Sequence, residues 1–247
     1  MIKENNPSTP KYALVTGASR GIGAAIAESL AREGYRLYLT CRHSTDRLSA
    51  LAKRLATQYG TQCTAVTADM GCPEDVDNLF MHIGTLDVLV NNAGISYVGL
   101  LHEMSVTDWQ EVMSTNLNAL FYTCRYAIPL MLPNHSGKII NISSVWGNVG
   151  ASMETAYSAS KGGVNSFTRA LAKELAPSNI QVNAIACGII DTDMNRCFSE
   201  EELTALRNEI PADRIGQPVE VAQMVLSLLH APEYLTGQVI ALDGGWR

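Results

Sequence analysis

Short β-prone runs alternate with stretches of helical apolar spacing from Lys11 to the end of the sequence. Seven runs are predicted to be strands: Tyr12–Thr16, Arg36–Cys41, Gln62–Thr67, Leu86–Val90, Lys138–Ser143, Ile180–Ile185 and Gln238–Leu242. The clearest helical stretches are Ile22–Glu33, Asp46–Tyr59, Val106–Met131 and Tyr157–Leu175. Strands that alternate with helices pair in parallel and need cover on both faces. The pattern therefore predicts an α/β fold, a doubly wound parallel sheet with helices on both faces.

The chain is best described as one domain, because no linker, charge block or shift of composition divides its 247 residues. That domain is predicted to span residues 11–247. The segment before it, residues 1–10, is polar, contains two prolines and is predicted to be a flexible tail. Residues 193–216 are less regular and contain one short helical run, SEEELTALRNEI, which is typical of a mobile lid over a substrate site.

Charge and composition exclude several classes of function. With 24 acidic against 18 basic side chains, the net charge of −6 argues against a protein that grips nucleic acid. No apolar run reaches the roughly 18 to 20 residues that span a membrane, and the polar first segment does not look like a signal peptide. The six cysteines and five histidines are scattered, without metal-ligand spacing. The sequence therefore predicts a cytoplasmic protein with reduced thiols and no metal site, with neither membrane nor nucleic acid as a partner.

A glycine-rich loop follows the first predicted strand and opens directly into a helix. It reads T-G-A-S-R-G-I-G, with its glycines spaced G-x-x-x-G-x-G. Glycines allow a tight turn and let backbone amides approach a pyrophosphate, which then lies at the positive end of the helix. The loop predicts a dinucleotide site, and its binding residues would be Gly17, Ser19, Arg20, Gly21, Ile22 and Gly23.

The end of the second predicted strand indicates which dinucleotide binds. A carboxylate at this place would accept a hydrogen bond from the ribose 2′-hydroxyl of NAD and would repel a 2′-phosphate. The sequence has Cys41 and Arg42 instead, and Arg20 stands within the glycine loop. Because planar guanidinium groups form charge-assisted hydrogen bonds with phosphate oxygens, the two arginines predict NADPH or NADP+ as the cofactor.

A tyrosine and a lysine share one face of a predicted helix. Tyr157 and Lys161 stand at i and i+4, about one turn apart. A free phenol has a pKa of about 10 and exchanges protons poorly at neutral pH, and a nearby ammonium favours the phenolate and lowers that pKa. Two polar motifs end earlier predicted strands, Asn91-Asn-Ala-Gly94 and Ile142-Ser-Ser144. Chance does not readily supply a glycine loop and these motifs in this order.

In this order the motifs resemble those of the short-chain dehydrogenase/reductase family, in its small single-domain branch. The resemblance spans essentially residues 11–245 and includes T-G-A-S-R-G-I-G, N-N-A-G, N-I-S-S, Y-S-A-S-K and the closing L-T-G-Q-V-I-A-L-D-G-G. It implies a Rossmann-type sheet with strand order 3-2-1-4-5-6-7 and reduction of a ketone to a secondary alcohol by hydride transfer. It also implies assembly as a homotetramer.

The resemblance further implies a role for each matching residue. Tyr157 would protonate the carbonyl oxygen, Ser144 would orient it, and Lys161 would lower the pKa of Tyr157 and hold the nicotinamide ribose. Asn116 would position a water that relays protons to Lys161, and Asp69 would contact the adenine edge. The other cofactor contacts that it implies are Met70, Asn92, Ala93, Gly94, Gly188, Ile190 and Thr192.

One position departs from the family's pattern. Family members commonly have Pro-Gly after the sixth strand, and this sequence has Cys187-Gly188. The loss of proline frees φ at that position and adds a backbone donor. We expect the nicotinamide to be placed slightly more loosely, with every catalytic group still present.

The general likeness within the family is to bacterial 3-oxoacyl-(acyl-carrier-protein) reductases, which implies a keto thioester on acyl carrier protein as the substrate. Those reductases dock the acidic carrier through two arginines near the site entrance. The matching positions in this sequence are His135 and Ser178. Both docking charges are therefore missing at these positions, and Lys138 and Arg169 are the basic residues that could compensate for them.

A second likeness concerns the loop between the serine and the tyrosine. Trp146, Met153 and Glu154 lie in this loop and are predicted to line the substrate pocket. The loop is similar to that of a subgroup that reduces a 5-aminopentanone group on elongation factor P, and an acidic Glu154 would suit such an amine-bearing substrate. A third alternative, a nucleotide-sensing protein without turnover, is disfavoured because the full set of catalytic residues is present.

Overall fold

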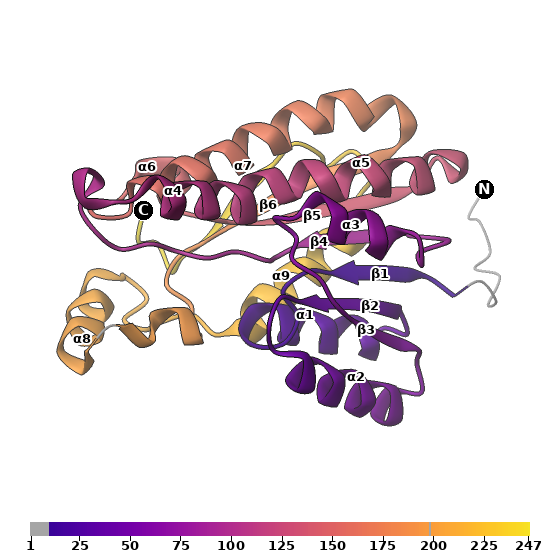
Figure 1. The fold of residues 1–247 in the computed structure, drawn as a ribbon, viewed down its shortest axis with the longest axis horizontal. Coiled ribbons are helices and arrows are strands. Elements are labelled where there is room, and N and C mark those ends of the chain that lie inside the picture. The colour runs from indigo at the N-terminus through magenta and orange to yellow at the C-terminus, as the bar shows by residue number, and fades with distance from the viewer. Residues whose placement is uncertain (1–9, 198) are drawn as a thin grey trace.

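Seven parallel strands form one sheet in the part of the chain that the computed structural model describes, residues 10–197 and 199–247 (Figure 1). The strands are β1 Tyr12–Val15, β2 Arg36–Cys41, β3 Cys63–Thr67, β4 Val88–Asn91, β5 Gly137–Ser144, β6 Ile180–Cys187 and β7 Val239–Leu242. Their order, β3-β2-β1-β4-β5-β6-β7, confirms the order that the family resemblance implies. The flexible tail predicted for residues 1–10 lies outside the described residues except for the exposed Pro10.

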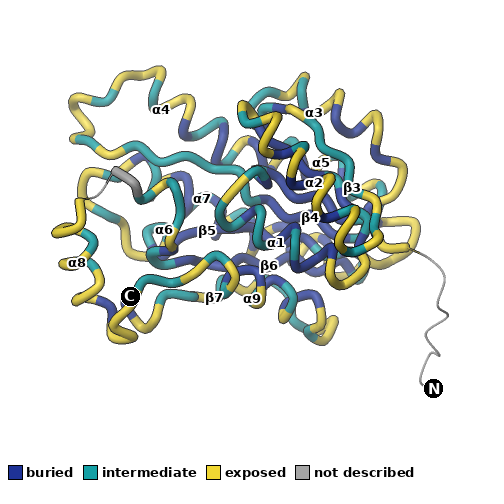
Figure 2. The backbone as a smooth tube through the Cα atoms, turned by 90° about the horizontal axis from the view of Figure 1, so that it is seen from below, coloured by how far each residue is buried: buried dark blue, intermediate teal, exposed yellow. Residues whose placement is uncertain are grey.

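Helices cover both faces of the sheet and build a hydrophobic core on each. One face carries α1 Gly21–Arg32, α2 Thr45–Tyr59 and α9 Pro218–His230, and the other carries α3 Pro73–Phe80, α5 Ala119–Met131 and α7 Thr155–Leu175. Ile26 and Val225 are fully buried in the first core, and Met131 is fully buried in the second. Figure 2 shows the buried strands enclosed between these layers, and β6 buries all eight of its residues. This is the doubly wound α/β fold that the sequence predicts.

The strand order creates a crevice beside the middle of the sheet. β1 pairs with β2 on one side and with β4 on the other. The chain leaves β1 toward β2 and leaves β4 toward β5, so the two connections diverge. In open parallel sheets, ligands bind outside the carboxyl ends of the strands at such a reversal. The fold therefore brings the glycine loop after β1 next to the N-N-A-G motif that ends β4.

The helix predicted for Val106–Met131 is interrupted. The structure has α4 Val106–Met113, a π turn at Ser114–Asn118 and then α5 Ala119–Met131. A π turn holds one more residue per turn than an α-helix, and such turns are frequent at functional sites. Here the turn carries Asn116, which is almost fully buried.

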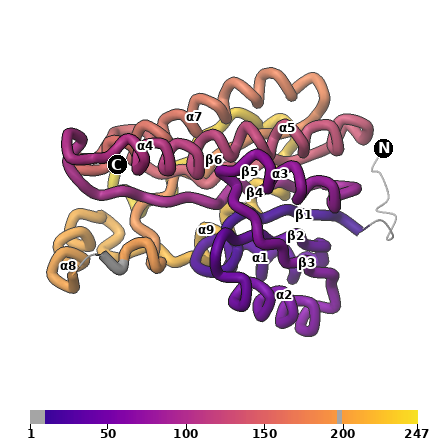
Figure 3. The backbone as a smooth tube through the Cα atoms, viewed as in Figure 1, coloured from indigo at the N-terminus to yellow at the C-terminus, as the bar shows by residue number. Residues whose placement is uncertain are grey.

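A short helix stands apart from these layers. It is α8 Glu200–Glu209, which Figure 3 shows away from the helices that flank the sheet. The helix begins at a capping box formed by Ser199 and Glu202 and buries none of its residues. This helix confirms the helical run predicted within residues 193–216, and the mobility of that segment stays a prediction. Another short helix, α6 Trp146–Val149, follows β5. Among the described helices, none has the length and apolar character needed to cross a bilayer.

Candidate active site

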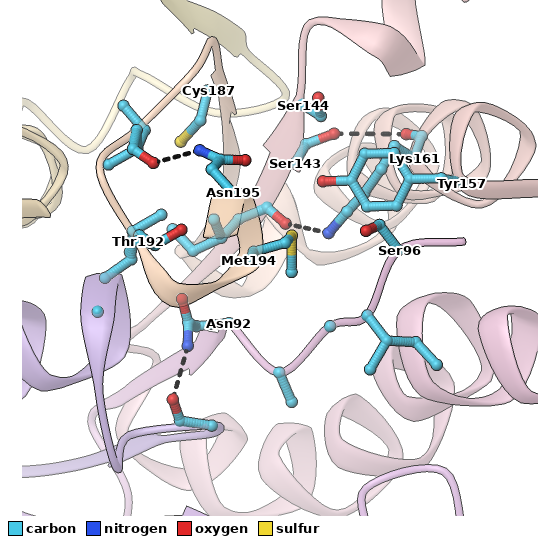
Figure 4. Close-up of a pocket in the computed structure, with 18 of the residues that line it drawn as sticks. Asn92, Ser96, Ser143, Ser144, Tyr157, Lys161, Cys187, Thr192, Met194 and Asn195 are labelled. Carbon is cyan, nitrogen blue, oxygen red and sulfur yellow. Dashed lines mark hydrogen bonds between the residues drawn. The ribbon is translucent and has the colours of Figure 1, made fainter. Parts of the chain in front are cut away.

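A cavity of about 1200 Å³ opens at the carboxyl edge of the sheet (Figure 4). Its wall includes the glycine loop, the ends of β2, β4, β5 and β6, the first turns of α7, and the segment that leads into α8. Pockets for drug-sized ligands measure about 300 to 1000 Å³. The cavity therefore has room for a dinucleotide together with part of a second molecule.

The glycine loop is packed so tightly that two of its glycines have no space for a side chain. A Cβ on Gly23 would clash with the carbonyl oxygen of Gly17, and a Cβ on Gly17 would lie 2.9 Å from the Cα of Ala93. Asn92 closes the same corner, because its Nδ2 donates to backbone carbonyl oxygens of the loop at 2.9 and 3.1 Å. The loop therefore exposes its backbone, rather than side chains, to the cavity at the start of α1. A pyrophosphate binds to backbone N–H groups at such a helix start.

Arg42 lines the cavity, and its guanidinium group is held by two carboxylates. Its Nε lies 2.9 Å from Oδ2 of Asp69, and its Nη1 lies 2.6 Å from Oε1 of Glu111 on α4. The hydrogen bond with Glu111 raises the pKa of Arg42. The other oxygen of Asp69 accepts from the backbone N–H of Gly71. A phosphate that binds Arg42 must therefore displace or share two carboxylate partners.

The second predicted arginine, Arg20, holds the beginning of the lid segment. Its Nε lies 3.4 Å from Oδ2 of Asp193, and Nη1 of Arg47 on α2 reaches the same oxygen at 3.4 Å. The neighbouring Thr192 lies over the glycine loop, since its Cγ2 would be 3.3 Å from a Cβ on Gly21. The segment after β6 consequently crosses the dinucleotide end of the cavity.

Ser144, Tyr157 and Lys161 come together in the cavity (Figure 4). Ser144 ends β5 and hydrogen-bonds to the phenol of Tyr157, which lies on the first turn of α7. One turn later, Lys161 places its Nζ 5.6 Å from the centroid of the tyrosine ring. The Nζ also donates to the carbonyl oxygen of Ile142 on β5 at 2.9 Å. The three side chains therefore occupy one site, as their spacing in the sequence predicts.

Burial controls the pKa of Tyr157. Because protein encloses the phenol, burial raises its pKa well above the usual range, and the hydrogen bond with Ser144 opposes this only in part. Burial outweighs the other influences on this phenol in the protein alone, and the expectation that Lys161 lowers its pKa stays a prediction. The phenol consequently stays protonated at neutral pH and is able to donate its proton.

Lys161 is an ammonium group that the protein encloses. Burial lowers the pKa of Lys161 to about 8. The Cys187 thiol lies close to it, but burial raises the pKa of that thiol to about 12, so the thiol is neutral at physiological pH. Among the described residues, no carboxylate contributes to the pKa of Lys161. The fold therefore keeps a charged or readily charged group in its interior at a cost in stability.

We expect this buried ammonium to make the free energy of unfolding rise between about pH 8 and pH 10.5. In that range the unfolded chain keeps a proton on Lys161 that the folded protein has released, and stability rises with pH wherever the unfolded state binds more protons. Lys161→Met removes the group and should remove that part of the rise. Urea unfolding of both proteins at several pH values measures it, and identical pH profiles would contradict the assignment.

Asn116 lies behind Lys161 and does not line the cavity. Its Oδ1 accepts from the backbone N–H of Ile95 at 2.8 Å, and its Nδ2 donates to the carbonyl of Ile95 at 2.8 Å and to the hydroxyl of Ser160 at 3.0 Å. A Cβ on Gly94 would lie 3.3 Å from this Oδ1 and 3.5 Å from the Nζ of Lys161. The side chain thus joins the segment after β4 to α7, and its predicted role in a water relay stays a prediction.

Trp146 and Glu154 line the substrate end of the cavity. The carboxylate of Glu154 hydrogen-bonds to the side chain of Trp146, and burial raises the pKa of Glu154. Met153, which the sequence also assigns to this pocket, is exposed and does not line the cavity. The backbone of Met153 has a left-handed conformation, with a φ of 62°, at the point where its side chain is exposed to solvent. The structure thus corrects the assignment of Met153.

The predicted cofactor residues other than the catalytic pair all lie on the cavity wall. They are Gly17, Ser19, Arg20, Gly21, Ile22, Gly23, Arg42, Asp69, Met70, Asn92, Ala93, Gly94, Gly188, Ile190 and Thr192. Charged or aromatic lining residues that the motifs do not indicate include Glu111, Glu209, Trp246 and Arg247. Glu111 belongs to no motif. Trp246 and Arg247 directly follow the closing D-G-G motif, which was the one available signal for them.

Comparison with known proteins agrees with this geometry. Residues 11–203 match the family model for short chain dehydrogenases. The chain is 42% identical over 240 residues to the 3-oxoacyl-[acyl-carrier-protein] reductase FabG of Aquifex aeolicus (strain VF5), covering 95% of this chain and 96% of the relative. It is 39% identical over 239 residues to the uncharacterized oxidoreductase YmfI of Bacillus subtilis (strain 168), covering 96% and 99%.

A solved structure shows the same fold. The crystal structure of YwfH, described as an NADPH dependent reductase involved in bacilysin biosynthesis, matches with a TM-score of 0.90 and 26% sequence identity. The match covers 97% of this chain and 99% of that one. Together with the assembled Ser144, Tyr157 and Lys161, these findings show that the chain is an oxidoreductase and belongs to the short-chain dehydrogenase family.

Proposed function

We propose that this protein reduces a ketone to a secondary alcohol with NADPH. The observation that carries the proposal is the meeting of Ser144, Tyr157 and Lys161 in the cavity that the glycine loop also lines. A nicotinamide bound in that cavity supplies the hydride. Ser144 orients the substrate by a hydrogen bond to its carbonyl oxygen, and Tyr157 gives its proton to that oxygen as negative charge develops there. The ammonium of Lys161 then stabilises the phenolate that remains.

NADPH is favoured over NADH by the charges at the adenosine end of the cavity. Arg20 and Arg42 both line this end, and the position after Thr40, where a carboxylate would select NAD, is Cys41. A 2′-phosphate carries more charge than the single carboxylates that now hold Arg42, so it competes well for the guanidinium group. The description of YwfH as NADPH dependent agrees with this choice.

The first candidate substrate is a 3-oxoacyl thioester on acyl carrier protein, supported by the likeness to FabG. One proposed carrier contact is not available in this structure. Lys138 donates its ammonium to the carbonyl oxygens of Leu228 and Ala231 at the end of α9, at 3.2 and 3.1 Å. Arg169, exposed on α7, remains as the other compensating charge for an acidic carrier.

Glu154 favours a second candidate, a small ketone that carries an ammonium group. Its carboxylate is partly buried at the substrate end, where burial raises its pKa and the side chain of Trp146 hydrogen-bonds to it. A partly desolvated carboxylate is stabilised by a cationic partner within about 4 to 6 Å. A 5-aminopentanone group, as on modified elongation factor P, would bring such an ammonium group to the pocket together with its ketone.

A substrate panel with purified protein tests both candidates, with NADPH oxidation followed by absorbance. We expect turnover of acetoacetyl thioesters or of 5-aminopentan-2-one. If Glu154 binds the ammonium group of the natural substrate, Glu154→Gln should raise KM for the aminoketone about tenfold. A hydrogen bond between charged groups contributes roughly 1.5 to 3 kcal/mol. KM for the thioester should not change. Equal changes for both substrates would remove the amine candidate, and no oxidation with any ketone would overturn the proposed reaction.

We also expect the protein to assemble as a homotetramer in which α4, α5 and α7 pack against a partner's copies. Val106 and Trp109 on α4 and Phe121 on α5 are large apolar side chains exposed to solvent, and assembly would bury them. Light scattering at micromolar concentration should give the mass of four chains. Phe121→Arg should shift the protein to smaller species, and a monomeric mass for the unmodified protein would contradict the expectation.

A further inference from the structure

The chain turns after β7, at the carboxyl edge of the sheet, and places Trp246 and Arg247 on the cavity wall. Gly244 makes this possible with a φ of 68°, which L side chains rarely adopt. Oδ2 of Asp243 accepts from the backbone N–H of Arg247 at 3.0 Å and fixes the turn. A Cβ on Gly244 would lie 2.8 Å from the side chain of Ile210, so the turn presses against the segment that follows α8.

Both side chains then pack on Trp146 at the substrate end of the cavity. Trp246 is only 6% exposed, and its ring lies edge-on to that of Trp146 with 4.8 Å between the centroids. The guanidinium carbon of Arg247 lies 4.1 Å from the centroid of the Trp246 ring and 5.3 Å from that of Trp146. Aromatic pairs and stacked guanidinium groups of this kind are favourable contacts. The loop that bears Trp146 is thereby tied to residues 100 positions later.

Glu209 connects the lid helix to these two residues. As the last residue of α8, it accepts hydrogen bonds on Oε2 from Nε1 of Trp246 at 3.2 Å and from Nη2 of Arg247 at 3.1 Å. These bonds lower the pKa of Glu209. None of the residues of α8 is buried. Leu206 of this helix is partly buried, and it packs against the small core that contains Trp246. Figure 2 shows the exposed α8 beside the end of the chain.

We propose that Trp246, Arg247 and Glu209, here called the lid clasp, hold α8 in place as the far wall of the substrate site. All three line the same cavity as Ser144 and Tyr157, and so does Leu206 of α8. Within the described residues, the hydrogen bonds between clasp side chains and their ring contacts involve only one another and Trp146, which is not assigned to the dinucleotide. It therefore sets the affinity for the ketone, while the proton donor and the cofactor site keep their geometry without it. This inference rests on the proposed ketone reduction.

Kinetics of clasp variants are the first test. Arg247→Ala and Glu209→Ala should each raise KM for the ketone about three- to fivefold, a modest effect because exposed ion pairs contribute little. The values of kcat and of KM for NADPH should stay as they are. The double variant should lose less than the sum of the two single losses, since both changes break the ion pair between Glu209 and Arg247. Glu209→Gln keeps the acceptor oxygen and should recover part of the affinity, and Glu201→Ala on the exposed surface of α8 is the matched control.

Hydrogen–deuterium exchange in the NADP+-bound protein is the second test, and it does not depend on turnover. Amides of residues 200–209 should exchange faster in Arg247→Ala than in the unmodified protein, while those of α7 should not change. Unchanged exchange in α8 together with an unchanged KM would overturn the clasp. A fall in kcat at constant KM would also overturn it. If no ketone in the panel supports NADPH oxidation by the unmodified protein, the proposed reaction fails. The exchange rates of residues 200–209 then decide the clasp by themselves.

Discussion

Tyr157→Phe is expected to lower kcat for ketone reduction by about 10²- to 10⁴-fold, the usual contribution of a positioned acid. The change removes the hydroxyl and keeps the ring, so the space beside Lys161 stays filled. Burial raises the pKa of Tyr157, so the phenol holds the transferable proton at neutral pH. The nearby Lys161 ammonium is engaged by the carbonyl of Ile142. Stopped-flow or steady-state rates at saturating NADPH measure the loss.

Two controls separate chemistry from folding in this experiment. The affinity of Tyr157→Phe for NADPH, measured by the change in cofactor fluorescence on binding, should equal that of the unmodified protein. Tyr59→Phe alters a tyrosine that hydrogen-bonds to Glu28 far from the cavity, and it should leave kcat unchanged. If Tyr157→Phe retained half of the original activity, Tyr157 would not be the acid.

Arg42→Ala is expected to raise KM for NADPH by about ten- to a hundredfold while kinetics with NADH stay nearly the same. A hydrogen bond between charged groups contributes roughly 1.5 to 3 kcal/mol, and about 1.4 kcal/mol corresponds to a factor of ten. The side chain of Arg42 is 40% exposed, which places the effect nearer the lower figure. NADH has no 2′-phosphate for this side chain to bind. Cys41→Asp should go further, because it adds an acceptor for a 2′-hydroxyl and repels the phosphate.

A change at Glu111 should alter KM for NADPH in the opposite direction to Arg42→Ala. Because Glu111 holds Nη1 of Arg42 at 2.6 Å, Glu111→Gln should release the guanidinium group and lower KM for NADPH. Arg54→Ala is the matched control, since Arg54 forms a comparable surface pair with Glu28 on the outer side of α1 and α2. Equal efficiency of the unmodified protein with NADH and NADPH would show that Arg20 and Arg42 do not select the cofactor.

The order of strands and helices could be predicted because apolar spacing is a local property of the sequence. Strand β2 was predicted with its observed bounds, Arg36–Cys41, and β3 differs by one residue at its start. The interrupted helix at Val106–Met131 could not be predicted in this way, because the apolar pattern continues through the π turn. What accompanies the turn is tertiary contact: the amide of Asn116 bonds to Ile95 and Ser160, which lie in distant segments.

The residues of the candidate site that belong to sequence motifs could be predicted. The ion pairs between residues that are distant in the sequence could not. Ser144, Tyr157 and Lys161 follow from sequence order, but the pKa of Tyr157 depends on burial, which no local pattern contains. Likewise, Arg42 and Glu111 are 69 positions apart and meet only because α4 passes the end of β2. The lid clasp has the same origin, since its members come from α8 and from the segment after β7.

The position of β1 between β2 and β4 determines when the sheet can close during synthesis. Its first partner strand, β2, begins at Arg36, but its second partner, β4, begins only at Val88. At about 5 to 20 residues per second, a ribosome leaves one edge of β1 unpaired for several seconds. During that time Ala13, Leu14 and Val15, which are fully buried in the finished protein, have no cover on that side. An unpaired apolar strand edge is a template for aggregation, so the nascent half-sheet β3-β2-β1 is exposed to aggregation until β4 has been made.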